Sequence, residues 1–276
     1  SSAALLLGGM VESYTNPGIA EVLTHSGRLI ESSRRRIIET GQMVFDTHLP
    51  HGLRPWASGW RTLLQIRLLH AHIRHHLRAR TAPGEPVPID QEQSAYTMLM
   101  FDVGVAQGLA QLGVNWNAEE RRLHHHFWRL AGWLLGVDPM LLPPHFEQAA
   151  QLRDDIRQRH FHVGDQARAL THALVAGVER QPPFFLPRST LYGLARRLHG
   201  EEISDQLELP RSRLQSGLFS ALRAPFGGLG EALRRLNGLE RFSHDVGQRY
   251  GRWIISRGLE GRPATFQTEI RNKRDR

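Results

Sequence analysis

Residues 60–80 are the stretch that most restricts how this chain can fold. Apolar side chains recur there at spacings of three and four, with a histidine in the middle of the stripe. The stripe consists of Leu63, Ile66, His70, Ile73 and Leu77. At 100° per residue, Arg67 and Arg74 point about 40 to 60° away from His70. The pattern predicts a helix whose inner face carries an imidazole flanked by two guanidinium groups.

A histidine on an apolar stripe has two interpretations. In the first, His70 is a core residue bonded to a backbone carbonyl, and acidic neighbours pair with the arginines. In the second, His70 binds a haem iron, its aliphatic neighbours contact the macrocycle, and Arg67 and Arg74 bind the two propionates. In both interpretations the two arginines have an anionic partner, because an unpaired charge beside an apolar core costs free energy. The residues alone leave both open.

Composition limits the class of protein. The chain has 276 residues, of which 40% are hydrophobic, and this suits one domain spanning residues 1–276. No apolar run approaches the roughly 20 residues of a membrane-spanning helix. Cysteine is absent, so neither disulfides nor thiolate ligands occur. The first residues lack the features of a secretory signal, which favours a cytoplasmic protein, and they read like the middle of a helix, which suggests a missing upstream segment.

The formal net charge is +8, and all but one of the 35 basic residues are arginine. These arginines are spread over every segment and are not interleaved with stacking aromatic residues. We therefore expect solvated helix faces and no nucleic-acid partner.

The other periodic segments also predict helices. They lie at 90–113, 117–136, 146–178, 190–209 and 211–258, the third being one helix or two. In the most apolar of them, 90–113, Gly104 and Gly108 allow a neighbouring helix or a flat ligand to approach closely. In 117–136 the apolar stripe Leu123, Phe127, Leu130 and Leu134 predicts the inner face. No segment alternates like a strand, so the fold class is all-α.

Two histidine clusters offer a different metal chemistry. His72, His75 and His76, together with residues 124–126, could act as histidine boxes of a non-haem di-iron enzyme. However, consecutive residues on a helix point in different directions, so at most one of residues 124–126 faces inward. This is the less favoured alternative.

Five stretches resemble the family of the rubber oxygenases (latex clearing proteins) and MpaB-type oxygenases. They are residues 24–40, 66–74, 91–113, 127–137 and 195–210, in the family's order. The arginine, histidine and arginine at positions 67, 70 and 74 are the most specific part. The resemblance implies an all-α, globin-like core that holds haem b in a pocket, with additional helices around it.

The resemblance also implies roles for particular residues. His70 matches the proximal iron ligand, and Arg67 and Arg74 match residues that fix the haem or its propionates. Arg36 and Thr40 match the family's arginine and threonine close to the haem. Characterised relatives cleave carbon–carbon double bonds of isoprenoid chains with O2. The expected partners are therefore O2 and a small hydrophobic molecule of isoprenoid or lipid-like type.

This chain departs from the rubber oxygenases at two positions. Their lysine just before the threonine is replaced by Glu39, and their catalytic glutamate aligns loosely with Glu21, which becomes a candidate base. The residues alone favour the simpler interpretation, in which Glu21 is a surface glutamate, Arg36 is an exposed arginine and Thr40 is bonded back to its own helix. A haem-binding helical protein without catalytic activity is a further alternative to the oxygenase, because both need the same pocket.

Overall fold

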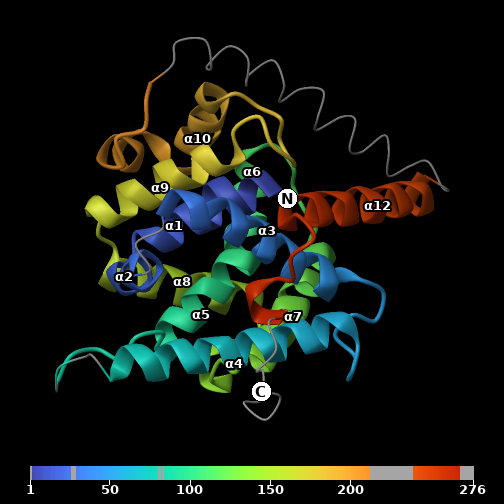
Figure 1. Cartoon of the computed structure of the whole chain (residues 1–276), viewed down its shortest axis with the longest axis horizontal. Coiled ribbons are helices and arrows are strands. Elements are labelled where there is room, and N and C mark those ends of the chain that lie inside the picture. The colour runs from blue at the N-terminus through green and yellow to red at the C-terminus, as the bar shows by residue number, and fades with distance from the viewer. Residues whose placement is uncertain (1, 26–28, 80–81, 83, 212–238, 268–276) are drawn as a thin grey trace.

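The computed structural model describes residues 2–25, 29–79, 82, 84–211 and 239–267. Every regular element in these ranges is a helix, which confirms the all-α prediction (Figure 1). The elements are η1 (Ala4–Met10), α1 (Val11–Tyr14), α2 (Pro17–Thr24), α3 (Leu29–His48), α4 (Ser58–Arg78), α5 (Gln91–Leu99), η2 (Met100–Gly104), α6 (Val105–Gln111), α7 (Ala118–Leu135), η3 (Pro139–Leu141), α8 (Phe146–His160), α9 (Asp165–Val178), α10 (Arg188–Gln206), α12 (Leu239–Leu259) and η4 (Thr265–Gln267).

Some helix ends follow local sequence signals. The side chain of Asn16 caps α2 and that of Asp90 caps α5, each accepting a hydrogen bond from the first turn. A reciprocal capping box between Asn117 and Glu120 starts α7, which ends at Gly136 with φ of +89°. The segment 146–178 forms two helices, α8 and α9. For 211–258, the later part is α12, and residues 212–238 lie outside the described ranges.

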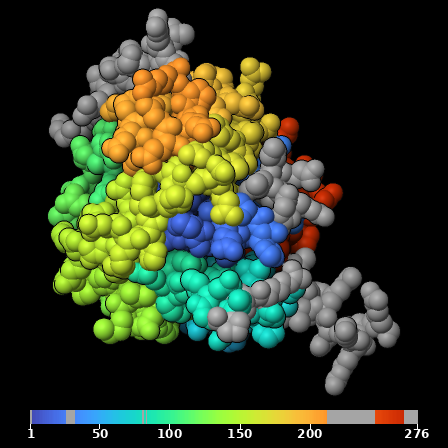
Figure 2. Space-filling view, turned by 90° about the vertical axis from the view of Figure 1, so that its left-hand side faces the viewer, coloured from blue at the N-terminus to red at the C-terminus, as the bar shows by residue number. Residues whose placement is uncertain are grey.

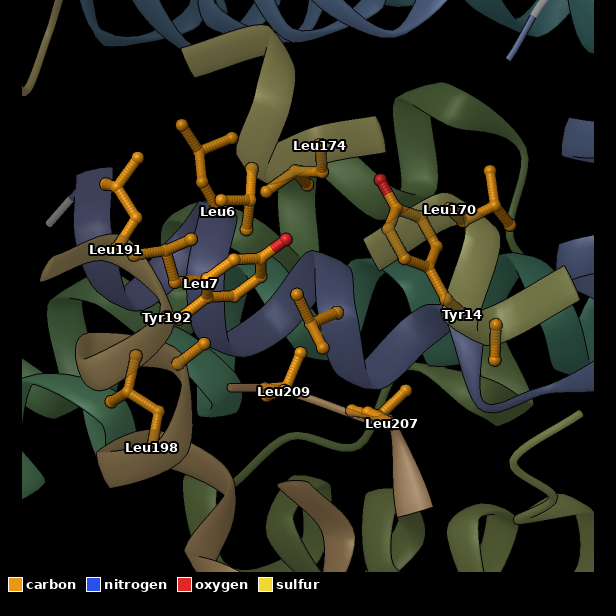
Figure 3. Packing of buried hydrophobic residues seen from close by; sticks show 14 of the residues in the cluster. Leu6, Leu7, Tyr14, Leu170, Leu174, Leu191, Tyr192, Leu198, Leu207 and Leu209 are labelled. Carbon is orange, nitrogen blue, oxygen red and sulfur yellow. The ribbon is translucent and has the colours of Figure 1, made fainter. Parts of the chain in front are cut away.

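The N-terminal helix is the centre of the fold. Leu7 and Val11 are fully buried in an apolar cluster formed with α9 and α10 (Figure 3). Figure 2 shows this blue N-terminal part enclosed between the yellow segments above it and the teal part of the chain below it. The carboxylate of Glu12 is also buried, and it forms an ion pair of 2.5 Å with Arg153 on α8. Because these residues are buried, the N-terminal helix (η1 and α1) is held firmly in the core.

The apolar segment 91–111 crosses the N-terminal helix at very short range. A Cβ atom at Gly9 would lie 3.0 Å from the carbonyl oxygen of Met100, and one at Gly108 would lie 2.9 Å from the Cβ of Ala4. The Cα of Gly9 is also the neighbour of Gly104. The spacing of Gly104 and Gly108 therefore serves the approach of a helix, η1, and not of a flat ligand. Both η1 and η2 are π-helical at this crossing.

The predicted inner face of α7 was wrong in part. Leu123 and Leu130 are 53% and 38% exposed, whereas His125 and Trp128 are buried. The reason is a polar contact, because Nδ1 of His125 lies 2.6 Å from Oδ2 of the buried Asp102 on η2. This pair rotates α7 relative to the face that apolar periodicity alone would choose.

The imidazole of His125 is held in its charged form. Nδ1 faces a carboxylate, and Nε2 lies 3.0 Å from the carbonyl oxygen of Pro143. Both partners can only accept, so both ring nitrogens must donate. Burial lowers the pKa of His125, but the hydrogen bond and charge of Asp102 outweigh it, and the net pKa is raised.

We predict that the substitution His125→Gln destabilises the protein in a pH-dependent way. A raised folded-state pKa adds stability that is fully present below the unfolded value of 6.5 and is lost as pH rises through the folded pKa. The loss in the free energy of unfolding should be about 3 kcal/mol below pH 6.5 and smaller at higher pH. Urea unfolding of both proteins across pH measures this difference. A loss that does not change with pH would show that His125 is neutral in the fold.

Candidate functional site

A cavity of about 980 Å³, partly open to solvent, lies between the helices. This volume is at the upper end of the range of about 300–1,000 Å³ that is usual for small-molecule and cofactor sites. Helices α3 and α4 contribute the longest runs of lining residues, and η1, α1, α2, α5, η2, the end of α7 and η4 supply the remainder of the wall, with one residue from α9. The interior is therefore large enough for a bulky organic ligand.

The inward face of α4 is the one that the sequence predicted. Leu63 and Leu77 are buried at the two ends of the stripe, while Ile66, His70 and Ile73 line the cavity between them. These three side chains are only partly covered because they face the open interior. The helical period thus brings one imidazole into an otherwise aliphatic stretch of wall.

The His70 ring is neutral and makes no hydrogen bond to any residue in the described ranges. Burial, and to a lesser degree the charge of Arg74, lower its pKa to about 4. At neutral pH one ring nitrogen therefore carries a free lone pair, and the side chain lines the cavity. A neutral imidazole nitrogen in this state is a common metal ligand in proteins.

Arg67 and Arg74 also line the cavity, one turn before and after His70. Arg74 donates from Nε and Nη2 to the carbonyl oxygen of Ile89, at 3.0 and 2.7 Å. Arg67 lies against Gly136, where a Cβ atom would come within 2.7 Å of its Nε. Arg67 is exposed and Arg74 is half-buried, and neither is paired with an acidic side chain among the described residues.

Arg36 and Thr40 on α3 both line the cavity. Arg36 donates from Nη1 to the carbonyl oxygen of Leu23 at 2.9 Å, and burial lowers its pKa. The hydroxyl of Thr40 is not bonded to the preceding helical turn, and it has no partner in the part of the chain that the structure describes. The interpretation of Thr40 as a back-bonded threonine is thus wrong, and its hydroxyl faces the interior.

The structure changes which residues are candidates for acid–base roles. Glu21 is exposed on α2 and does not line the cavity, so its position does not support a role as base. Tyr14 and Glu39 do line it. Burial raises the pKa of Tyr14, which keeps its hydroxyl protonated. Sequence reasoning missed Tyr14, because its only local signal is the turn before Asn16, and its burial depends on helices far along the chain.

The histidine clusters do not form a second metal site. His72, His75 and His76 are exposed on the outer side of α4. His125 is buried and bonded, whereas His126 is exposed, as expected from their different directions on α7. No three potential ligands among the described residues converge on one point. The geometry therefore does not support the di-iron alternative.

These features define a class, namely a helical protein with a large cavity whose wall carries a neutral histidine. Comparison with known proteins then gives the family. The family model described as "ER-bound oxygenase mpaB/B'/Rubber oxygenase, catalytic domain" matches residues 1–239. The chain belongs to this family of oxygenases, which confirms the resemblance seen in the sequence.

A solved structure has the same fold. "Structure of Latex Clearing Protein LCP in the closed state" aligns with a TM-score of 0.71 and 21% sequence identity, over 92% of this chain and 70% of that chain. No curated protein matches the sequence. None of the helices in the described ranges has both the length and the apolar character that crossing a membrane requires.

We predict that His70 of the protein without added ligand stays neutral far below the pH at which an ordinary histidine is protonated. Its imidazole resonances should titrate with a pKa of about 4, and the substitution Arg74→Ala should raise that pKa by removing a positive charge. Because the folded pKa lies below 6.5, the protein should lose stability relative to His70→Phe as pH falls from 6.5 towards 4. The exposed His72 is the internal control in the NMR titration. A pKa near 6.5 for His70 would mean that water solvates the ring freely.

Proposed function

We propose that this protein is a haem b-dependent oxygenase that acts on a hydrophobic alkene of isoprenoid or lipid-like type. The observation that carries the proposal is the neutral, unbonded His70 in the wall of a large cavity, beside two arginines without acidic partners. Membership of an oxygenase family supports the reaction class.

The residues present fit a haem group. His70 would hold the iron, because a neutral imidazole with no other hydrogen bond can supply a lone pair to it. Arg67 and Arg74 would hold the propionates, since guanidinium groups bind carboxylates through paired hydrogen bonds. Ile66 and Ile73 supply apolar surface on the same helix face for the macrocycle.

The bound haem would supply redox chemistry with O2, which protein side chains lack. In the overall reaction, one carbon–carbon double bond and the bond of O2 break, and two carbon–oxygen double bonds form. Both oxygen atoms enter the products, so the reaction needs no external reductant. An isoprenoid or unsaturated lipid chain offers suitable double bonds.

The protein's own side chains would bind and orient the substrate. The largely apolar wall takes up a hydrophobic chain and excludes water, because moving apolar surface out of water is favourable. The Thr40 hydroxyl and the Tyr14 hydroxyl are neutral donors in this wall, and Arg36 is a cationic one. Such donors stabilise negative charge that develops on oxygen during the reaction. Glu21 is not part of this proposed site.

We predict that the purified protein takes up one equivalent of haem b and shows its intense absorption band. The substitution His70→Ala should shift or remove that band, because the axial ligand is lost. Arg67→Ala and Arg74→Ala should each weaken haem binding by about tenfold, as expected for the loss of a charge-assisted hydrogen bond of about 1.5 kcal/mol. Titration with haem measures both effects.

His72→Ala is the matched control, since His72 is exposed on the same helix and should leave the spectrum unchanged. Carbon monoxide should alter the spectrum of the wild-type protein by binding the free coordination position. A protein that takes up no haem, or a His70→Ala variant with the wild-type spectrum, would overturn the proposed cofactor site.

We further predict that the haem-loaded protein consumes O2 in the presence of an unsaturated isoprenoid and forms carbonyl products. With ¹⁸O2, each of the two products should carry one labelled oxygen atom. Thr40→Val should slow the reaction by about ten- to a hundredfold while leaving the haem spectrum close to that of the wild type, because it removes one oxygen-facing donor. Haem uptake without any substrate-dependent O2 consumption would favour the non-catalytic haem-binding alternative.

A further inference from the structure

We propose that the C-terminal residues 263–266 form a wall segment of the cavity, held in place by Glu39, and that Phe266 limits the size of the molecule that fits. The inference rests on the proposed function only in taking this cavity as the binding site for a hydrophobic substrate. It concerns residues after position 239, where the match to the family ends.

The carboxylate of Glu39 holds this segment through a single oxygen. Its Oε1 accepts hydrogen bonds from the backbone nitrogen of Thr265 at 2.8 Å and from the Thr265 hydroxyl at 2.7 Å. The same oxygen accepts from Nε of Arg35 at 2.9 Å. Arg35 in turn donates from Nη2 to the carbonyl oxygen of Pro263 at 2.7 Å. Two side chains of α3 therefore bind two residues of this segment, Pro263 and Thr265.

The chemistry of position 39 is what allows this contact. A carboxylate accepts hydrogen bonds, whereas the lysine that the resemblance places here in rubber oxygenases carries three donors and no acceptor. A lysine could not accept from either group of Thr265. With glutamate in place of lysine, position 39 can accept hydrogen bonds and so anchor the C-terminal segment.

Phe266 links the two helices that carry the candidate haem site. Its side chain is 8% exposed and belongs to one apolar cluster with Ile38 of α3 and with Ile66 and Leu69 of α4. Phe266 and Thr265 both line the cavity. Figure 1 shows the red segment running from the end of α12 towards α4. The ring therefore packs on the apolar cluster shared by α3 and α4 and forms part of the cavity wall.

Helix α12 reaches this position by packing closely on α3. A Cβ atom at Gly258 would lie 2.5 Å from Ile38, and one at Gly251 would lie 2.7 Å from Phe45. Glycine at these two positions lets the helices approach, which places Thr265 and Phe266 in the cavity wall. The wall is thus built by a helix whose contacts fit α3 closely.

The proposal is tested first by enlarging the cavity. Dissociation constants of farnesol and geranylgeraniol are measured by calorimetry on the haem-loaded protein, with the haem spectrum of each sample as a check. Phe266→Ala should shift the ratio of the two constants towards the longer alcohol by about tenfold or more, because pockets discriminate apolar groups by that order. Phe185→Ala is the control, since Phe185 is 54% exposed and does not line the cavity.

The anchor is tested by hydrogen exchange, which needs no activity. Exchange in residues 246–267 should be at least about tenfold faster in Glu39→Ala, as expected when charge-assisted hydrogen bonds are lost. Glu39→Gln should be intermediate, because its amide oxygen still accepts. Glu202→Ala, an exposed glutamate on α10, should match the wild type.

The two proposals fail in different ways. A protein without the haem spectrum overturns the proposed function. With that spectrum intact, an unchanged preference in Phe266→Ala overturns the role of Phe266, and unchanged exchange in Glu39→Ala overturns the anchor.

Discussion

The uncharged imidazole of His70, facing an internal cavity, is the constraint on which the candidate site depends. Burial and the nearby charge of Arg74 both disfavour its protonation, so the ring keeps a free lone pair at neutral pH. The same arginine is tied to the carbonyl oxygen of Ile89 and has no acidic partner in the described ranges. A neutral imidazole and a positive charge without an acidic partner in the described ranges therefore occur together, and the proposed haem site rests on this combination.

The cavity exists because the helices around it are held apart and held firmly. The buried N-terminal helix is fixed by apolar packing and by the ion pair of Glu12 with Arg153. The crossing of η1 with η2 is close enough to need glycine at position 9, and Met100 and Phe101 beyond it line the cavity. On the far side of η2, Asp102 binds His125 and fixes α7. These close contacts between the helices around the cavity thus keep a space of this size open.

The C-terminal segment lies outside residues 1–239, the part of the chain that matches the family model. Residues 1–239 supply α3, α4 and the candidate haem-binding residues, while Glu39 anchors Thr265, which lies beyond that match. Substitutions in the C-terminal segment would change which substrates fit without altering the candidate haem-binding residues. Specificity and cofactor binding would then lie on different parts of the chain.

The sequence by itself determined the helices and the inward direction of His70, because helix caps and apolar periodicity act over a few residues. It also indicated that Arg36 and Thr40 share a face, although only the resemblance to a family gave that face a meaning. The tertiary structure alone decided the burial of His125, the exposure of Glu21 and the place of Tyr14 in the wall. It also joined Glu39 to Thr265, which is 226 residues away in the chain. Such contacts depend on which surfaces meet after the helices pack, and local spacing carries no record of that choice.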